Sequence, residues 1–195
     1  MTAGIKANAD GSAAIQVGGS DAITITSGLV VSMNGGVGGL VSGTAVASTS
    51  GTSIDFTSIP SWVKRITVMF NGVSTNGTSN VQIQIGAGSI TTTGYLSYSA
   101  YAGSTNVSAG VGFTTGFGIS LGNAANLYSG HFVFTNISGN AWVGSFVVGY
   151  NTSGIYYVAT GGGSITLGGA LDRVRITTVN GTDTFDAGSI NILYE

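Results

Sequence analysis

Apolar and polar residues alternate in short stretches along most of this chain. In residues 64–70 apolar side chains stand at every second position, and residues 80–85 repeat the pattern with Val, Ile and Ile separated by Gln. A period of two is typical of a β-strand with one buried face, and helical spacing is sustained nowhere. Further strands are expected at 94–101, 111–121, 128–135, 141–150, 154–160, 172–178 and 188–193.

The segments between these runs are rich in Gly, Asn, Ser and Thr. Such residues supply the positive φ angles that tight reversals between strands require. We therefore predict an all-β fold, an antiparallel jelly-roll-like β-sandwich over residues 46–195. Roughly eight to ten short strands in about 150 residues are enough to enclose one core.

Residues 1–45 differ in kind, because they are rich in Ala, Gly and Ser and contain only two short alternating pieces, 14–17 and 22–26. Alone they bury too little apolar area to offset the entropy of ordering. We expect an extended N-terminal arm or short trimeric stalk that orders by intertwining with sister copies or by lying on another protein as an added strand. A flexible linker is the alternative. The candidate attachment or trimer-interface residues are the apolar ones: Ile15, Val17, Ile23, Ile25, Leu29 and Val31.

Charge and reactive side chains are scarce: the chain has 5 Lys and Arg, 7 Asp and Glu, one His and no Cys. Enzymes rely on clusters of such groups with tuned pKa values. We therefore expect a non-enzymatic structural or binding protein with no catalytic residues, metal or other cofactor. A surface this poor in charge favours burial against copies of the same chain or a larger assembly.

Two classes of partner are not expected. Five basic residues give no electrostatic footprint for a phosphate backbone, which argues against nucleic acid. The apolar runs are all interrupted well short of the ~18 residues of a membrane-spanning helix.

Residues 47–75 contain the string IDF-x-x-IP-x-WVKRI. This run resembles the opening of a jelly-roll module found at the C-terminal ends of tailed-bacteriophage tail fibres and other virion surface proteins. Residues 6–25 are similar to stalk segments of the same proteins. The resemblance implies a homotrimeric protein on the virion surface, made in the host cytoplasm, without catalytic residues.

Two functions fit that resemblance. In the first, the N-terminal segment lies on the major capsid protein and the jelly roll projects as a decoration or cement protein, which the short N-terminal segment favours. The alternative is a short tail fibre, or receptor-binding tip, whose loops at 74–79, 103–110, 150–154 and 159–164 recognise host surface glycans. Its candidate aromatic residues are Tyr98, Tyr101, Tyr150, Tyr156 and Tyr157. Tyrosine is equally favoured at subunit interfaces.

A sandwich-type glycan hydrolase is the weakest candidate function. It needs two carboxylates facing each other across a sugar, and no Glu precedes Glu195.

Several single residues have competing interpretations. Trp62 fits a core anchor better than a receptor contact, and Trp142 is expected in the core. His131 should share a strand face with Val133. The aspartates at 172, 183 and 186 match no cation-binding loop, and Arg173 and Arg175 fit charge pairs with neighbouring aspartates.

Overall fold

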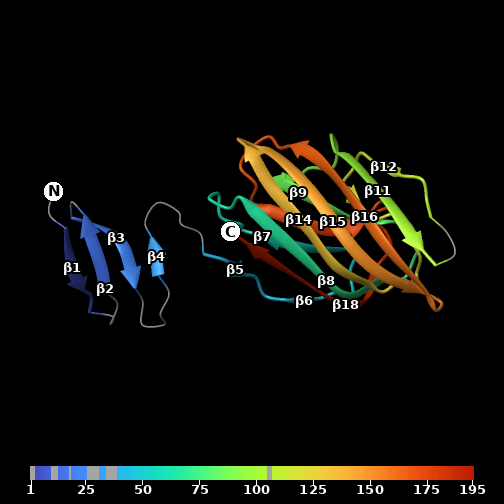
Figure 1. Cartoon of the computed structure of the whole chain (residues 1–195), viewed down its shortest axis with the longest axis horizontal. Helices are drawn as coiled ribbons and strands as arrows, with labels where there is room; N and C mark the ends of the chain where they lie inside the picture. The colour runs from blue at the N-terminus through green and yellow to red at the C-terminus, as the bar shows by residue number, and fades with distance from the viewer. Residues whose placement is uncertain (1–2, 10–12, 18, 26–30, 34–38, 105–106) are drawn as a thin grey trace. The chain divides into compact units, whose positions relative to one another are not determined.

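The computed structural model describes residues 3–9, 13–17, 19–25, 31–33, 39–104 and 107–195. All elements within these ranges are β-strands, and the chain divides into two units, Met1–Gly39 and Leu40–Glu195 (Figure 1). The division lies before residue 45, because β5 (Val41–Ser42) and β6 (Val46–Ala47) pair with the last strand, β18 (Phe185–Tyr194), in the second unit.

The first unit is a small antiparallel sheet in which neighbours along the chain are neighbours in space. Its four strands are β1 (Ala3–Ala7), β2 (Ala13–Val17), β3 (Ser20–Ile25) and β4 (Val31–Met33). The β2–β3 reversal contains Gly19 at a φ of 83°, a conformation that glycine adopts without steric cost.

The second unit contains two antiparallel sheets. The smaller has the order β10 (Ser89–Ile90), β9 (Val81–Ala87), β17 (Arg173–Thr178), β7 (Ser53–Thr57), with β13 (Phe117–Gly118) also on β9. The larger has the order β12 (Val111–Phe113), β11 (Leu96–Gly103), β16 (Ile155–Thr166), β15 (Ala141–Thr152), β14 (Tyr128–Ser138), β8 (Arg65–Thr75), β18, β5, with β6 also on β18.

The chain passes repeatedly from one sheet to the other. It places β7, β9, β13 and β17 in the smaller sheet and β8, β11, β12, the β14–β15–β16 meander and β18 in the larger. This alternation between the sheets, with β17 hydrogen-bonded between β7 and β9, is the connectivity of a jelly roll. The β14–β15–β16 meander takes the place of a single strand between β8 and β11. The predicted antiparallel jelly-roll-like sandwich is confirmed.

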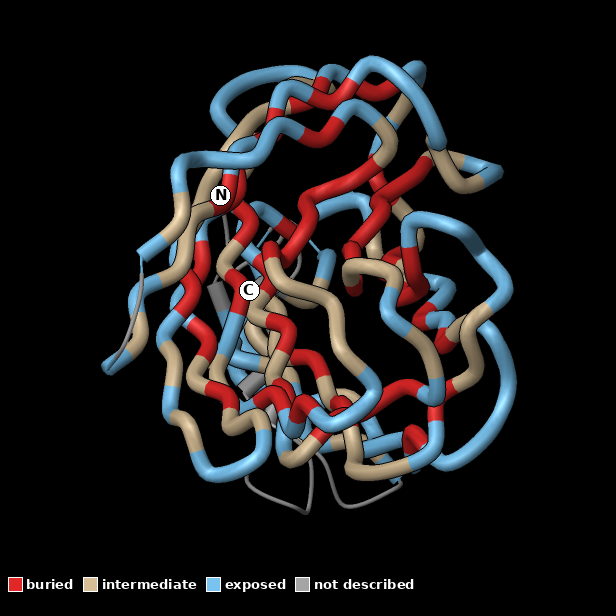
Figure 2. The backbone as a smooth tube through the Cα atoms, turned by 90° about the vertical axis from the view of Figure 1, so that its right-hand side faces the viewer, coloured by how far each residue is buried: buried red, intermediate tan, exposed pale blue. Residues whose placement is uncertain are grey.

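The core lies between the two sheets (Figure 2), and many of its members stand at alternate positions along their strands. Ile66 and Val68 of β8 and Ile83 and Ile85 of β9 are fully buried. A Phe cluster joins them: Phe132 on β14 stacks on Phe146, its direct partner on β15, with ring centroids 4.1 Å apart. The apolar side chains of both sheets therefore pack into one continuous core.

The two tryptophans behave differently. Trp142 is 3% exposed, as expected, whereas Trp62 is 36% exposed and its ring centroid lies 6.0 Å from that of Tyr194. The core interpretation of Trp62 was wrong because Ile59 and Val63, on either side of the turn that carries Trp62, take the buried positions.

The glycine run at 161–163 was expected in a loop spanning residues 159–164. The structure contradicts this: the whole segment lies within β16 and is paired with β15 on one side and β11 on the other. The five candidate tyrosines lie on β11, β15 and β16, within the strands that the alternating pattern predicted.

Candidate functional site

The small N-terminal sheet carries a row of isoleucines. Ile5 on β1 is paired with Ile15 on β2, which is paired in turn with Ile23 on β3. Ile5 is 82% exposed and Ile15 38% exposed. Side chains directly opposite on antiparallel strands share one face of the sheet, so this row is a continuous apolar strip.

The other face of the same sheet is mostly polar, with the small, buried Ala14 opposite Lys6. Lys6 is exposed next to Ile5, and the Gln16 side chain donates a hydrogen bond of 2.6 Å to the Asp21 carboxylate. The sheet is therefore amphipathic. A lone sheet of short strands with one apolar face is marginally stable in water and gains stability when that face is covered.

The remaining candidate attachment residues differ in where the structure places them. Val17 is 43% exposed and lies two positions from Ile15, on the same face of β2. The backbone register places Ile25 on β3 opposite Val31 on β4, and Leu29 lies outside the described residues. The sequence did not single out Ile5, although it continues the row onto β1.

The five candidate tyrosines fall on opposite faces of the larger sheet. Tyr98 and Tyr156 are 58% and 75% exposed and lie on the outer face of the sheet. They share this face because Tyr98 is paired with Gly162, and residues 156 and 162 point to the same side of β16. They do not form one aromatic platform: six residues of strand, from 156 to 162, separate their levels by about 20 Å.

The other three point inward and pack as a group. Tyr150 stacks on Tyr157 with centroids 5.3 Å apart, and Tyr101 meets Tyr157 edge-on at 5.7 Å. Tyr128 joins the group at 5.2 Å from Tyr150. Tyr128 and Tyr150 belong to the buried core and Tyr101 and Tyr157 are partly buried against it, so this group offers little free surface to a receptor.

Burial changes the acidity of several tyrosines. Desolvation raises the pKa of Tyr128 to about 12, although the hydrogen bond from Asn126 partly opposes the shift. Desolvation is the main cause that raises the pKa of Tyr150, and the nearby Tyr128 is the second. The Tyr150 hydroxyl is buried without a hydrogen-bond partner in the described structure. All of these phenols are therefore neutral near pH 7 and unsuited to proton transfer.

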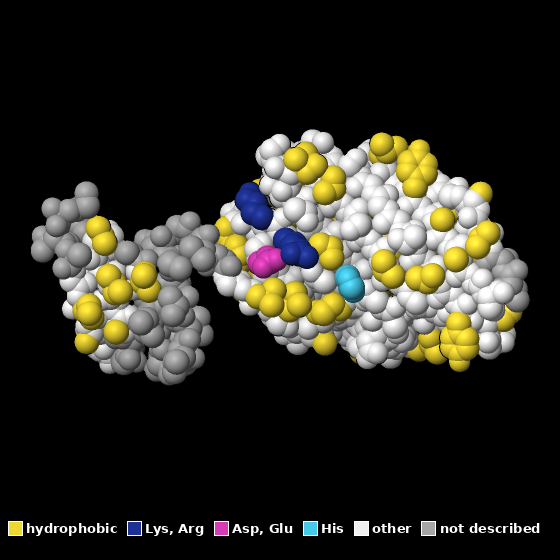
Figure 3. Space-filling model, in the orientation of Figure 1, with side chains coloured by type: hydrophobic (Ala, Val, Ile, Leu, Met, Phe, Trp, Pro, Cys, Tyr) yellow, Lys and Arg dark blue, Asp and Glu magenta, His cyan; other side chains and the backbone are white. Residues whose placement is uncertain are grey.

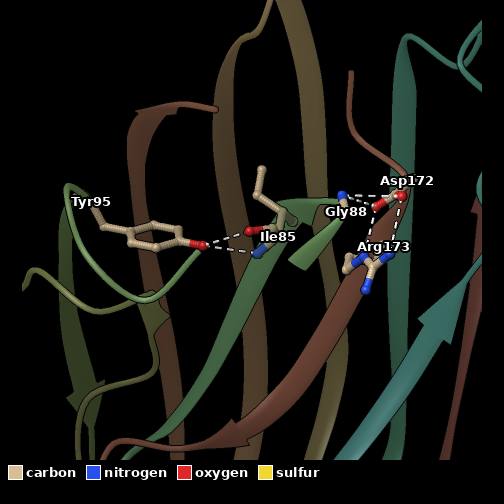
Figure 4. Close-up of polar contacts among 5 residues, drawn as sticks. All are labelled: Ile85, Gly88, Tyr95, Asp172 and Arg173. Carbon is tan, nitrogen blue, oxygen red and sulfur yellow. Dashed lines mark hydrogen bonds and ion pairs between the residues drawn. The ribbon is translucent and has the colours of Figure 1, made fainter. Parts of the chain in front are cut away.

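Figure 4 shows two polar contacts that stabilise the smaller sheet and the loops beside it. The Tyr95 hydroxyl accepts a hydrogen bond from the Ile85 amide at 2.9 Å and lies 3.0 Å from the Ile85 carbonyl oxygen; desolvation raises the pKa of this phenol to about 12. The Asp172 carboxylate accepts hydrogen bonds from Arg173 at 2.7 and 3.1 Å and from the Gly88 amide. The Arg173 hydrogen bond lowers the pKa of Asp172.

The predicted charge pairs form within the chain. Arg175 makes two contacts of 2.7 Å with Asp55, the residue opposite it on β7. Asp183 instead accepts hydrogen bonds from the Ser79 amide and the Asn180 side chain. No group of three or more His, Cys, Asp or Glu residues within the described ranges could hold a metal ion.

One broad face of the sandwich is almost uncharged. Figure 3 shows the Lys, Arg, Asp and Glu side chains of this face gathered at one end, with hydrophobic side chains scattered over the rest. His131 is exposed, while Phe132 and Phe134 on the opposite face of β14 are fully buried, as the alternation predicted. This surface offers shape and weak polarity rather than charge to any partner.

Comparison with known proteins finds no matching protein-family model, curated protein or solved structure. Within the described part of the chain, no helix is long and apolar enough to cross a membrane.

Proposed function

We propose that this chain is a non-enzymatic structural protein of a tailed-bacteriophage virion, a homotrimeric projection that decorates or cements the capsid through its N-terminal unit. The observation that carries the proposal is the apolar row formed by Ile5, Ile15 and Ile23 on a small sheet separate from the sandwich core. Such a row is stabilised when sister copies or a capsid surface cover it.

Two further features support this role. The sandwich has one continuous buried core, and the chain as a whole is poor in charge, with only 5 basic and 7 acidic residues. The run that resembles phage jelly-roll modules, residues 47–75, contains β7 and β8, the first long strands of the sandwich. A stable, inert body joined to an adhesive N-terminal unit fits a projection that strengthens a particle.

The trimer is tested by light scattering on the purified full chain, which should give three times 19.4 kDa. The double variant Ile5→Asp/Ile15→Asp places charge on the apolar row and should return the mass of one chain. Lys6→Asp introduces the same carboxylate on the opposite face of β1 and should remain trimeric. A parent chain that is monomeric at micromolar concentration contradicts the trimer.

The location is tested by gold-labelled antibody on intact particles. Label distributed over the heads supports decoration. Label confined to the tail end supports the second candidate, a fibre tip recognising glycans, which the exposure of Tyr98 and Tyr156 favours. Absence of label from every particle contradicts both.

A further inference from the structure

The outer face of the smaller sheet contains a recess of about 330 Å³ between β9, β17 and the start of β7. Thr92, before β11, and Thr115, between β12 and β13, form part of its wall. All of its lining residues except Val179 and Gly181 have polar side chains. Its volume lies at the lower end of the range of small-molecule sites.

Two glutamines form the floor of this recess. Gln82 and Gln84 alternate along β9 with the fully buried Val81, Ile83 and Ile85, so they point away from the core. They are nevertheless only 2% and 6% exposed. The alternating sequence indicated a solvated outer face for this strand and gave no sign that the glutamines are enclosed.

Hydrogen bonds fix both amides in place. The Gln82 side chain donates to the Thr178 carbonyl at 3.3 Å and accepts from the Thr115 hydroxyl at 2.9 Å. The Gln84 side chain donates to the Thr115 carbonyl at 2.8 Å. Burying glutamine is costly unless its polar atoms are paired. Amides held in this way are preorganised for a ligand and lose little entropy on binding.

The recess is electrically balanced. Arg175, opposite Gln84 on β17, is the single charged residue in its lining, and two of its nitrogens bind the Asp55 carboxylate at 2.7 Å. A paired guanidinium has little attraction left for an anion. The described lining contains no carboxylate to attract a cation. What remains is a set of hydroxyl and amide groups that both donate and accept hydrogen bonds.

We propose that this recess binds a neutral saccharide of one or two sugar rings. Sugar hydroxyls also donate and accept, so they complement the threonine, glutamine and asparagine groups of the lining without needing charge. The lining residues all belong to the second unit and lie on the smaller sheet and the loops beside it, whereas the exposed Tyr98 and Tyr156 lie on β11 and β16 of the larger sheet. The recess uses none of the residues on which the proposed attachment to the capsid depends.

The test is calorimetry and saturation-transfer NMR on the full chain with glucose, galactose, N-acetylglucosamine, maltose and lactose as probes. At least one probe should bind saturably. Thr92→Trp, at an exposed position on the wall, fills the recess without disturbing its floor and should weaken that binding by roughly tenfold or more. Thr135→Trp makes the same exchange at an exposed position on β14 in the other sheet and should leave binding unchanged.

A second variant tests the floor. Gln84→Leu removes the amide and should abolish binding while the circular dichroism spectrum stays that of the parent chain. Three results overturn the proposal: no saturable binding of any probe, binding that survives Thr92→Trp, or tighter binding of inorganic phosphate than of every sugar.

Discussion

The ring of Phe146 lies against the backbone of Gly161, the residue paired with it across β15 and β16. A Cβ atom at Gly161 would overlap this ring and the Tyr98 carbonyl oxygen on β11. Glycine inside a strand commonly marks such a close approach. The missing side chain lets Phe146 lie flat and stack on Phe132 in the core.

Gly161→Ala should therefore destabilise the sandwich. Overpacking at a site enclosed by backbone and an aromatic ring costs about 1–3 kcal/mol. Gly168→Ala is the matched control, because a Cβ there meets no atom within 4 Å, and it should change stability little. Urea unfolding of both variants makes the comparison, and equal midpoints would contradict the packing role of Gly161.

The glycine run at 161–163 was not predicted to be part of a strand, because its pairing partners cannot be identified from the sequence alone. Periodicity identified strands where apolar residues recur at every second position, as at Ile66 and Val68. At Gly161 the partner that requires glycine, Phe146, is distant in sequence, and the run is indistinguishable from a flexible loop until the register is known. The inward orientation of Tyr157 and the outward orientation of Tyr156 follow from alternation, but their neighbours follow only from pairing with β11 and β15.

Tyr150→Phe should leave stability unchanged or raise it by about 1 kcal/mol, because the Tyr150 hydroxyl is buried without a hydrogen-bond partner in the described structure. Tyr128→Phe is the counterpart in the same aromatic group. Its hydroxyl accepts from Asn126 at 2.7 Å and donates to the Leu121 carbonyl at 3.1 Å, so its loss should cost about 1–2 kcal/mol. Thermal unfolding measures both, and a larger loss for Tyr150→Phe would refute this assignment.

Stability should fall at alkaline pH. The pKa values of Tyr95 and Tyr128 are raised from 10.0 to about 12 in the folded chain. Below pH 10 both phenols are neutral in both states, and their stabilising contribution is fully present. Between pH 10 and 12 they ionise in the unfolded chain while the folded chain keeps its protons, so unfolding becomes easier by roughly 2 kcal/mol for each tyrosine.

Urea midpoints measured from pH 8 to 12 test this dependence. The slope above pH 10 should be shallower in Tyr128→Phe than in the parent chain, because one of the phenols with a raised pKa is gone. A midpoint that stays constant up to pH 12 would show that these hydroxyls ionise equally in both states.

Removing residues 1–39 should leave the sandwich folded. The second unit has its own core, and its first strand, β5, begins at Val41 and is retained. Its melting temperature should stay within about 5 °C of that of the parent chain, since the core described for the sandwich lies entirely in the retained residues.

The truncated chain should also be monomeric by light scattering and fail to attach to particles. A truncated chain that still attaches would place the anchor in the sandwich, and one that is still trimeric would place the subunit interface on its charge-poor faces rather than on the apolar row of Ile5, Ile15 and Ile23.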